Sequence, residues 1–137
     1  MAYSHAVHQI LFPSGLSATA SGDKANWVPG YVPYIIRAAG VVFTTSGATT
    51  SGAVIAFLHT NLASGSTASD LAVLNGPSGI GGKVLYKDGL NVKVSPGQKV
   101  TLNVRTAVTG SLAIRGFLFV EPAWDTPANN TNMVATT

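Results

Sequence analysis

The sequence lacks cysteine and has few charged residues. None of its 137 residues is cysteine, and Lys, Arg, Asp and Glu together make up 9% of them, against about 25% in a typical soluble domain. Without cysteine there is no disulfide framework and no thiolate metal site, so packing alone must stabilise the fold. The charge deficit leaves a surface of Thr, Ser, Asn, Gly and small apolar residues. Such a surface is typical of one covered by neighbours, and it predicts an oligomer or a lattice component.

Long apolar runs are also absent. No uninterrupted stretch approaches the roughly 20 apolar residues that span a bilayer, and the N-terminus, from Met1 to His5, lacks the basic start and apolar core of a signal peptide. We therefore expect a single domain over residues 1–137, no membrane partner, and a product that stays in the compartment where it is made. The sequon at Asn129 is interpreted as part of a polar tail.

Cations are present but do not cluster. The formal net charge is +3, yet the Lys and Arg residues are spread from Lys24 to Arg115 and no two are adjacent. Nucleic-acid binding needs a concentrated basic patch, because its affinity grows with the number of phosphates neutralised. We expect no nucleic-acid partner.

Catalytic groups are sparse as well. Glutamate occurs once, at Glu121, and the aspartates fall in expected loops or the tail, so no short-range carboxylate pair forms. Serine is plentiful, but no G-x-S-x-G elbow is present. Residues 76–83 resemble a phosphate loop, but Pro77 stands where that motif requires glycine and Val84 where it requires Ser or Thr. We expect no enzymatic activity, no catalytic residue and no cofactor.

The histidines do not predict a metal site. His5 and His8 form an H-x-x-H pair, and His59 is the third imidazole. On a strand, a three-residue spacing puts two side chains on opposite faces, which does not suit a shared metal. His5 and His8 are interpreted as polar positions on an N-terminal arm, and the alternative is that protonation near about pH 6 adjusts an interface.

The sequence does contain a regular alternation of apolar and polar residues, with a period of two. Residues 90–121 alternate apolar and polar side chains, most regularly over 99–105, which predicts consecutive half-buried β-strands. A two-residue hairpin at 95–98 would place Val94 opposite Lys99, an apolar side chain against a polar one. The chain is therefore expected to change sheets there, as at the corner of a Greek key, or to contain a bulge.

Two earlier segments are apolar on both alternating faces. Residues 34–45 and 53–58 are expected to form a long hairpin, with the first a central strand or one whose outer face meets another subunit. The polar connection 61–82 is expected to be a loop that crosses between sheets, with a helical turn near 69–74 that Asp70 helps to cap.

The other elements complete an all-β chain. Shorter strands are expected at residues 16–20, 83–87 and 112–121, a loop at 21–24, and an irregular, proline-rich loop at 27–33. About eight strands without an amphipathic helix predict an antiparallel β-sandwich, jelly-roll-like in arrangement. Residues 1–13 are expected to be an arm or the first strand, and 122–137 an extended tail.

The aromatic residues are the main candidates for binding. Trp and Tyr are favoured at interfaces, so Trp27, Tyr31, Tyr34 and Trp124 are expected to plug the ends of the sandwich or anchor a protein contact. The alternative is that exposed rings stack on sugars. The full set of candidate interface residues is Tyr3, His5, His8, Trp27, Tyr31, Tyr34 and Trp124.

Two stretches support a family resemblance. Residues 92–104, VKVSPGQKVTLNV, followed by 116–122, GFLFVEP, resemble small β-sandwich proteins of tailed bacteriophages, in particular capsid decoration or cement proteins. The resemblance implies a subunit, commonly trimeric, that is made in the host cytoplasm and sits on the capsid surface. Its implied partners are the major capsid protein and its own copies. The alternative is a sandwich from a phage tail or fibre that binds carbohydrate or a receptor.

Overall fold

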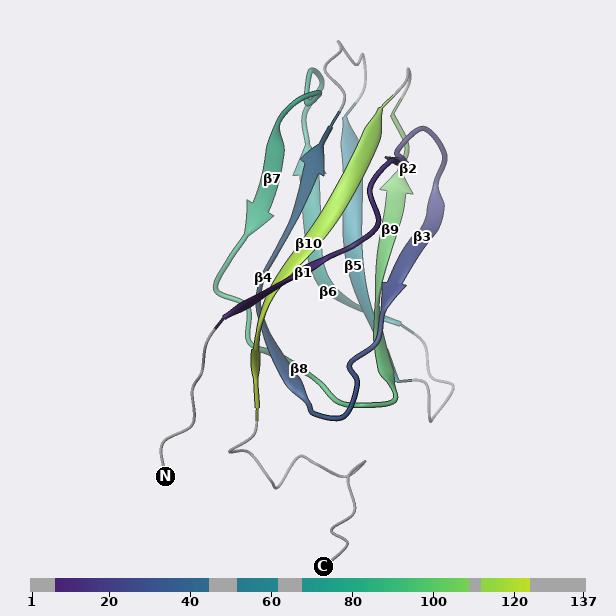
Figure 1. The fold of residues 1–137 in the computed structure, drawn as a ribbon. Coiled ribbons are helices and arrows are strands. Elements are labelled where there is room, and N and C mark those ends of the chain that lie inside the picture. The colour runs from purple at the N-terminus through teal and green to yellow at the C-terminus, as the bar shows by residue number, and fades with distance from the viewer. Residues whose placement is uncertain (1–6, 45–51, 62–67, 109–111, 124–137) are drawn as a thin grey trace, which may run out of the picture.

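The computed structural model describes residues 7–44, 52–61, 68–108 and 112–123, which form ten β-strands in two facing antiparallel sheets (Figure 1). Sheet I has the order β1 (His8–Leu11), β10 (Ala113–Pro122), β4 (Tyr34–Phe43) and β7 (Val84–Lys87), with β2 (Leu16–Ser17) also paired to β10 and β8 (Val92–Val94) also paired to β4. Sheet II has the order β3 (Gly22–Trp27), β9 (Gln98–Thr106), β5 (Ala53–Asn61) and β6 (Ser69–Gly76).

The two edges of sheet I are each made of an interrupted strand. β1 and β2 pair along the same strand, β10, while β7 and β8 pair along β4. Taken together as single strands, these pairs reduce the sandwich to eight strands, whose order is that of a jelly roll. The predicted all-β, antiparallel sandwich is therefore confirmed.

The core lies between the two sheets. Its largest fully buried side chains include Phe12, Phe43 and Phe57, and the rings of Phe12 and Phe57 meet at a centroid distance of 5.8 Å. Burying a side chain of this size contributes about 1.5–3 kcal/mol. Gly116 makes room for this packing, because a β-carbon there would lie 2.9 Å from a methyl carbon of Leu102.

The predicted change of sheets after β8 is confirmed. Val94 pairs with β4 in sheet I, whereas Gln98 begins β9 in sheet II. The turn between them is closed by two hydrogen bonds: Gln98 N donates to Ser95 O (3.1 Å), and Ser95 N donates to Gln98 Oε1 (3.0 Å). Gly97 has a φ of +88°, which glycine adopts without strain.

The prediction of a central strand at residues 34–45 is also confirmed, since β4 lies between β10 and β7. The predicted hairpin is wrong, because β4 and β5 belong to different sheets. The two-sided apolar pattern of β4 does not come from a hairpin partner. In β4 the inward side fills the core, and the outward side, described below, is part of an apolar surface.

Two local predictions in sheet II are wrong. The expected helical turn and crossing loop at 61–82 contain β6, which pairs with β5 and buries Leu71 and Leu74. Burial in a sheet overrides the weak helical preference of Leu and Ala. The expected loop at 21–24 opens β3, an edge strand with a bulge between Asp23 and Ala25. Edge strands and loops are both rich in polar residues, so the composition of β3 could not distinguish the two.

The remaining predictions concern where strands begin and end, and the two ends of the chain. β2 is shorter than the expected strand at 16–20, and Trp27 ends β3 instead of opening the irregular loop, which occupies 28–33. β1 realises the expected first strand, while the tail from residue 124 onward lies outside the described residues. The described part of the chain contains no helix of the length and hydropathy needed to cross a membrane.

Candidate interaction surface

The outer face of sheet I carries an apolar patch. Residues that pair across antiparallel strands share a face of the sheet. One such row contains Leu11, Phe117, Gly40 and Tyr86, on four neighbouring strands. Three large members are strongly exposed: Leu11 (51%), Val84 (55%) and Tyr86 (52%). The apolar patch consists of Leu11, Gly40, Val42, Val84, Tyr86, Phe117 and Phe119.

Three aromatic rings give the patch a fixed shape. Tyr86 and Phe117 stack with centroids 6.2 Å apart and an interplanar angle of 20°. Phe119 meets both rings edge-on, at 5.5 Å from Phe117 and 6.3 Å from Tyr86. Gly40 lies on the strand between them and leaves space for the Phe117 ring, which is only 7% exposed although it lies outside the core. The patch is therefore a packed apolar platform.

An ion pair borders this platform. The register of β10 against β4 shifts after Phe119, so that Arg37 is an extra residue on β4. The Nε of Arg37 donates to Glu121 Oε1 (2.8 Å), its Nη2 pairs with the same oxygen, and its Nη1 donates to Asn91 Oδ1 (2.9 Å). The side chain of Glu121 is only 14% exposed, so Arg37 compensates a carboxylate that is mostly removed from water.

A hollow of about 510 Å³ lies between the aromatic rings and this ion pair. Its apolar lining includes Ala38, Tyr86 and Phe119, and its polar lining includes Arg37, Asp88 and Asn91. The loop that supplies Asp88 and Asn91 joins the two pieces of the interrupted edge strand. Its Leu90 N donates to Arg37 O (3.0 Å), which attaches this wall to the extra residue of β4.

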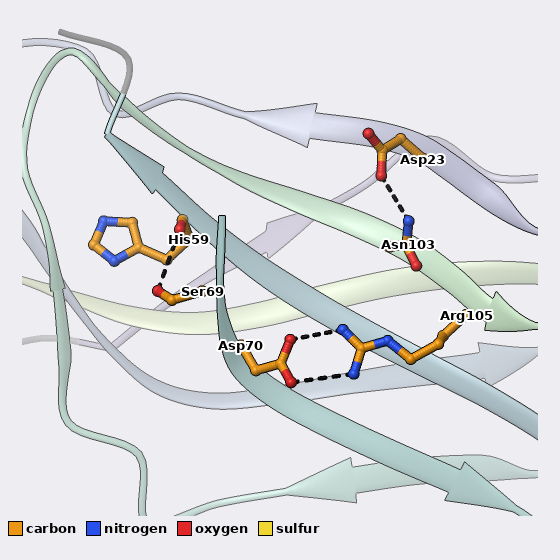
Figure 2. A network of polar contacts seen from close by, with 6 residues as sticks. All are labelled: Asp23, His59, Ser69, Asp70, Asn103 and Arg105. Carbon is orange, nitrogen blue, oxygen red and sulfur yellow. Dashed lines mark hydrogen bonds and ion pairs between the residues drawn. The ribbon is translucent and has the colours of Figure 1, made fainter. Parts of the chain in front are cut away.

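The outer face of sheet II is different in kind (Figure 2). Arg105 donates two hydrogen bonds to the Asp70 carboxylate, at 2.6 and 3.1 Å, and Asn103 donates to Asp23 at 2.6 Å. The hydrogen bond from Arg105 lowers the pKa of Asp70 and raises the pKa of Arg105. These polar groups bind one another and face solvent, beside the apolar side chains of Ala56, Leu58 and Val73, which lie on the same face but are half-buried or buried.

The predicted interface residues do not gather on one surface. Trp27 and Tyr34 pack edge-on at 5.7 Å, half-buried against the core, at the end of the sandwich where β3 is joined to β4. Tyr31 projects from the loop between them and is 90% exposed, while His8 is exposed at the start of β1. The other candidates, Tyr3, His5 and Trp124, lie outside the described residues.

The sequence prediction missed the apolar patch. Residues 112–121 were expected to form a half-buried strand, but β10 is apolar on both faces over 117–120. Four consecutive apolar residues cannot alternate with polar ones, so this run was the available signal for an outward-facing Phe117 and Phe119. Among the described residues, no group of three or more His, Asp or Glu could hold a metal ion.

Comparison with known proteins finds little. No family model and no curated protein matches the chain. The crystal structure of SPBc2 prophage-derived protein YomS matches 87% of this chain and 99% of that chain, with a TM-score of 0.46 and 18% sequence identity. That protein is of prophage origin. At this identity and TM-score the similarity carries no argument about function.

Proposed function

We propose that this chain is a non-enzymatic virion structural protein, a capsid decoration or cement protein that bridges subunits of the major capsid lattice. The apolar patch carries the proposal. A sandwich whose sheet II exposes hydrogen-bonded polar groups and whose sheet I exposes large apolar side chains suits a subunit that buries the face of sheet I in an assembly. The viral setting rests on the resemblance of residues 92–104 and 116–122 to decoration proteins.

The patch suits contact between identical copies. One charge beside it is compensated within the subunit, since Arg37 pairs with Glu121, while Arg115, which is paired with Val42 in the sheet, donates through Nε to the backbone oxygen of Phe12 (3.1 Å). Two such faces can therefore approach without burying an unpaired Arg37 or Glu121, provided that Arg115 stays at the solvated margin of the contact. A closed ring lets every copy bury its patch, and the family resemblance implies three copies.

A trimer would attach tightly even through weak individual contacts. Each contact with the shell would occur three times, and linked contacts bind far more strongly than single ones. The apolar patch is the surface that supports assembly among copies. The contact with the capsid protein is not assigned to any described residue.

The glycan groove of Trp27, Tyr31 and Trp124 has less support. Trp27 packs against Tyr34 and the core, so its ring is not a free stacking platform. A tail or fibre role based on those residues is therefore the weaker candidate.

The proposal is tested in two steps. Light scattering measures the mass of the purified chain, and cosedimentation with undecorated phage capsids measures binding to shells, with decorated capsids as the control. A trimer that pellets only with undecorated shells supports the proposal. A monomer that stays in the supernatant contradicts it.

A further inference from the structure

The hollow beside the apolar patch is built by two irregularities that meet. The extra residue of β4, Arg37, lies on one side, and the break between β7 and β8 lies on the other. At the break, Gly89 has a φ of +70°, a conformation that favours glycine. Because β7 and β8 form an edge of sheet I, the hollow lies at the margin of the sheet.

Its polar lining presents both donors and acceptors, and Arg37 and Asn91 hold each other in position. The guanidinium of Arg37 has five N–H groups, of which the bonds to Glu121 and Asn91 use three. Asn91 accepts through Oδ1, so its NH₂ group is left to donate to a ligand. The carboxylate of Asp88 adds an acceptor. These groups are prepared to bind hydroxyls, which donate and accept at once.

The hollow is also lined by the aromatic side chains of Tyr86 and Phe119. The ring of Tyr86 is about half exposed and is held by Phe117 and Phe119. A flat, rigid ring of this kind offers an apolar surface against which the C–H face of a sugar ring can lie.

The charges select among ligands. Arg37 is compensated by Glu121, and Asp88 adds a negative charge, so an anionic ligand is disfavoured. A purely apolar group would take the polar wall out of water without replacing its hydrogen bonds. A neutral sugar meets both walls. We propose that the hollow binds the ring of a neutral oligosaccharide, with Tyr86 as the stacking residue and Arg37, Asp88 and Asn91 as hydrogen-bonding residues.

This inference goes beyond the proposed function and does not depend on it. Tyr86 belongs to both the hollow and the apolar patch, so assembly through the patch competes with a sugar. Glycan binding is therefore measured on the Val84→Asp variant, which should not self-associate, as well as on the wild-type chain, and the oligomeric state is measured without sugar. Failure of one proposal is therefore distinguishable from failure of the other.

The test is an NMR titration of the full chain with maltotriose, chitotriose and mannotriose. We expect saturable shifts of the amides of Tyr86 and Asn91 with at least one of them, at a dissociation constant on the order of 1 mM. Tyr86→Ala and Asp88→Asn should each weaken binding at least tenfold. Tyr31→Ala removes a tyrosine that is more exposed than Tyr86 (90% against 52%) and lies outside the hollow, so it should leave binding unchanged.

Several outcomes would overturn the proposal. They are the absence of saturable shifts with all three sugars, an equal response of wild type and Asp88→Asn, or binding of sialyllactose, phosphate or N-acetylphenylalanine amide in place of the neutral sugars. Asp88→Asn changes an exposed loop residue and keeps its shape, so the test stands even if Tyr86→Ala perturbs the fold.

Discussion

The ring of Phe117 lies over the backbone of Gly40, so close that a β-carbon at position 40 would fall 2.1 Å from its Cζ atom. This contact explains how a phenylalanine on the outside of a sandwich is almost fully buried. The ring of Tyr86 stacks against it. The shape of the apolar patch therefore depends on a glycine that has no unusual backbone conformation.

Gly40→Ala should lower the free energy of unfolding by about 1–3 kcal/mol, because the new methyl group forces Phe117 from its place among Tyr86 and Phe119. Urea unfolding measures the change. In a Phe117→Ala background the same substitution should cost less, since the clash is gone. Gly30→Ala is the control: nothing lies within 4 Å of its β-carbon, so its effect should stay within about 0.5 kcal/mol. Equal effects at both glycines would contradict the prediction.

Val84→Asp should abolish self-association of the chain and leave the subunit folded. Val84 lies on the apolar patch and is 55% exposed, so a carboxylate there is solvated in the monomer but unpaired in the assembly. Light scattering measures the mass, and circular dichroism checks the fold. Val28→Asp is a matched control, because Val28 is 48% exposed in the loop between β3 and β4. Loss of association in both variants, or in neither, would contradict the apolar patch as the site of self-association.

Arg105→Gln should raise the pKa of Asp70 toward its ordinary value, because the hydrogen bond from Arg105 is the main cause of its lowered pKa. Carboxyl NMR titration measures both forms. Since the folded pKa lies below the unfolded one, the pair stabilises the fold above the unfolded pKa, and this contribution is lost as pH falls through the folded pKa. Both side chains are exposed, so the contribution is small and salt should reduce it further. An unchanged titration of Asp70 in the variant would refute the assigned cause.

A double-mutant cycle with Glu121→Gln and Arg37→Met should give a coupling energy of about 1 kcal/mol. Arg37 is 42% exposed and Glu121 only 14%, which places the pair between surface and buried ion pairs. Chemical unfolding of the four proteins measures it. Glu121→Gln combined with Arg115→Met should be additive, because Arg115 bonds to Phe12 O instead. A coupling near zero for the first pair would show that the observed bonds do not contribute to stability.

The sequence was most informative where local pattern and burial agree. Alternation predicted β8 and β9, and the mismatch between Val94 and Lys99 predicted the change of sheets between them. Local pattern could not assign a strand to a sheet, which is why β4 and β5 were expected to pair. It also failed at edges, where pairing with distant strands stabilises polar segments such as β3, whose Asp23 is bonded to Asn103.

The candidate surface was harder to predict than the fold. Residue type singled out Trp27 and Tyr34 as end plugs or contact anchors, and their neighbours in space make them part of the packing at one end of the sandwich. The apolar patch combines side chains from β1, β4, β7 and β10, and only the register between these strands brings Leu11, Tyr86 and Phe117 into one row. The hollow depends on a bulge and a strand break, which no periodicity specifies.

The position of β10 also has a consequence for synthesis. β10 is the last described strand of the chain and lies between β1 and β4, so neither can complete its pairing in sheet I before the ribosome has passed Pro122. At the usual rate of translation, the interval between β4 and the end of β10 lasts on the order of ten seconds. During that time the nascent chain exposes apolar strands with no partner, and folding then requires contacts between its two ends, which are slow to form. Production of this protein should therefore depend on how well the host keeps an unfinished chain soluble.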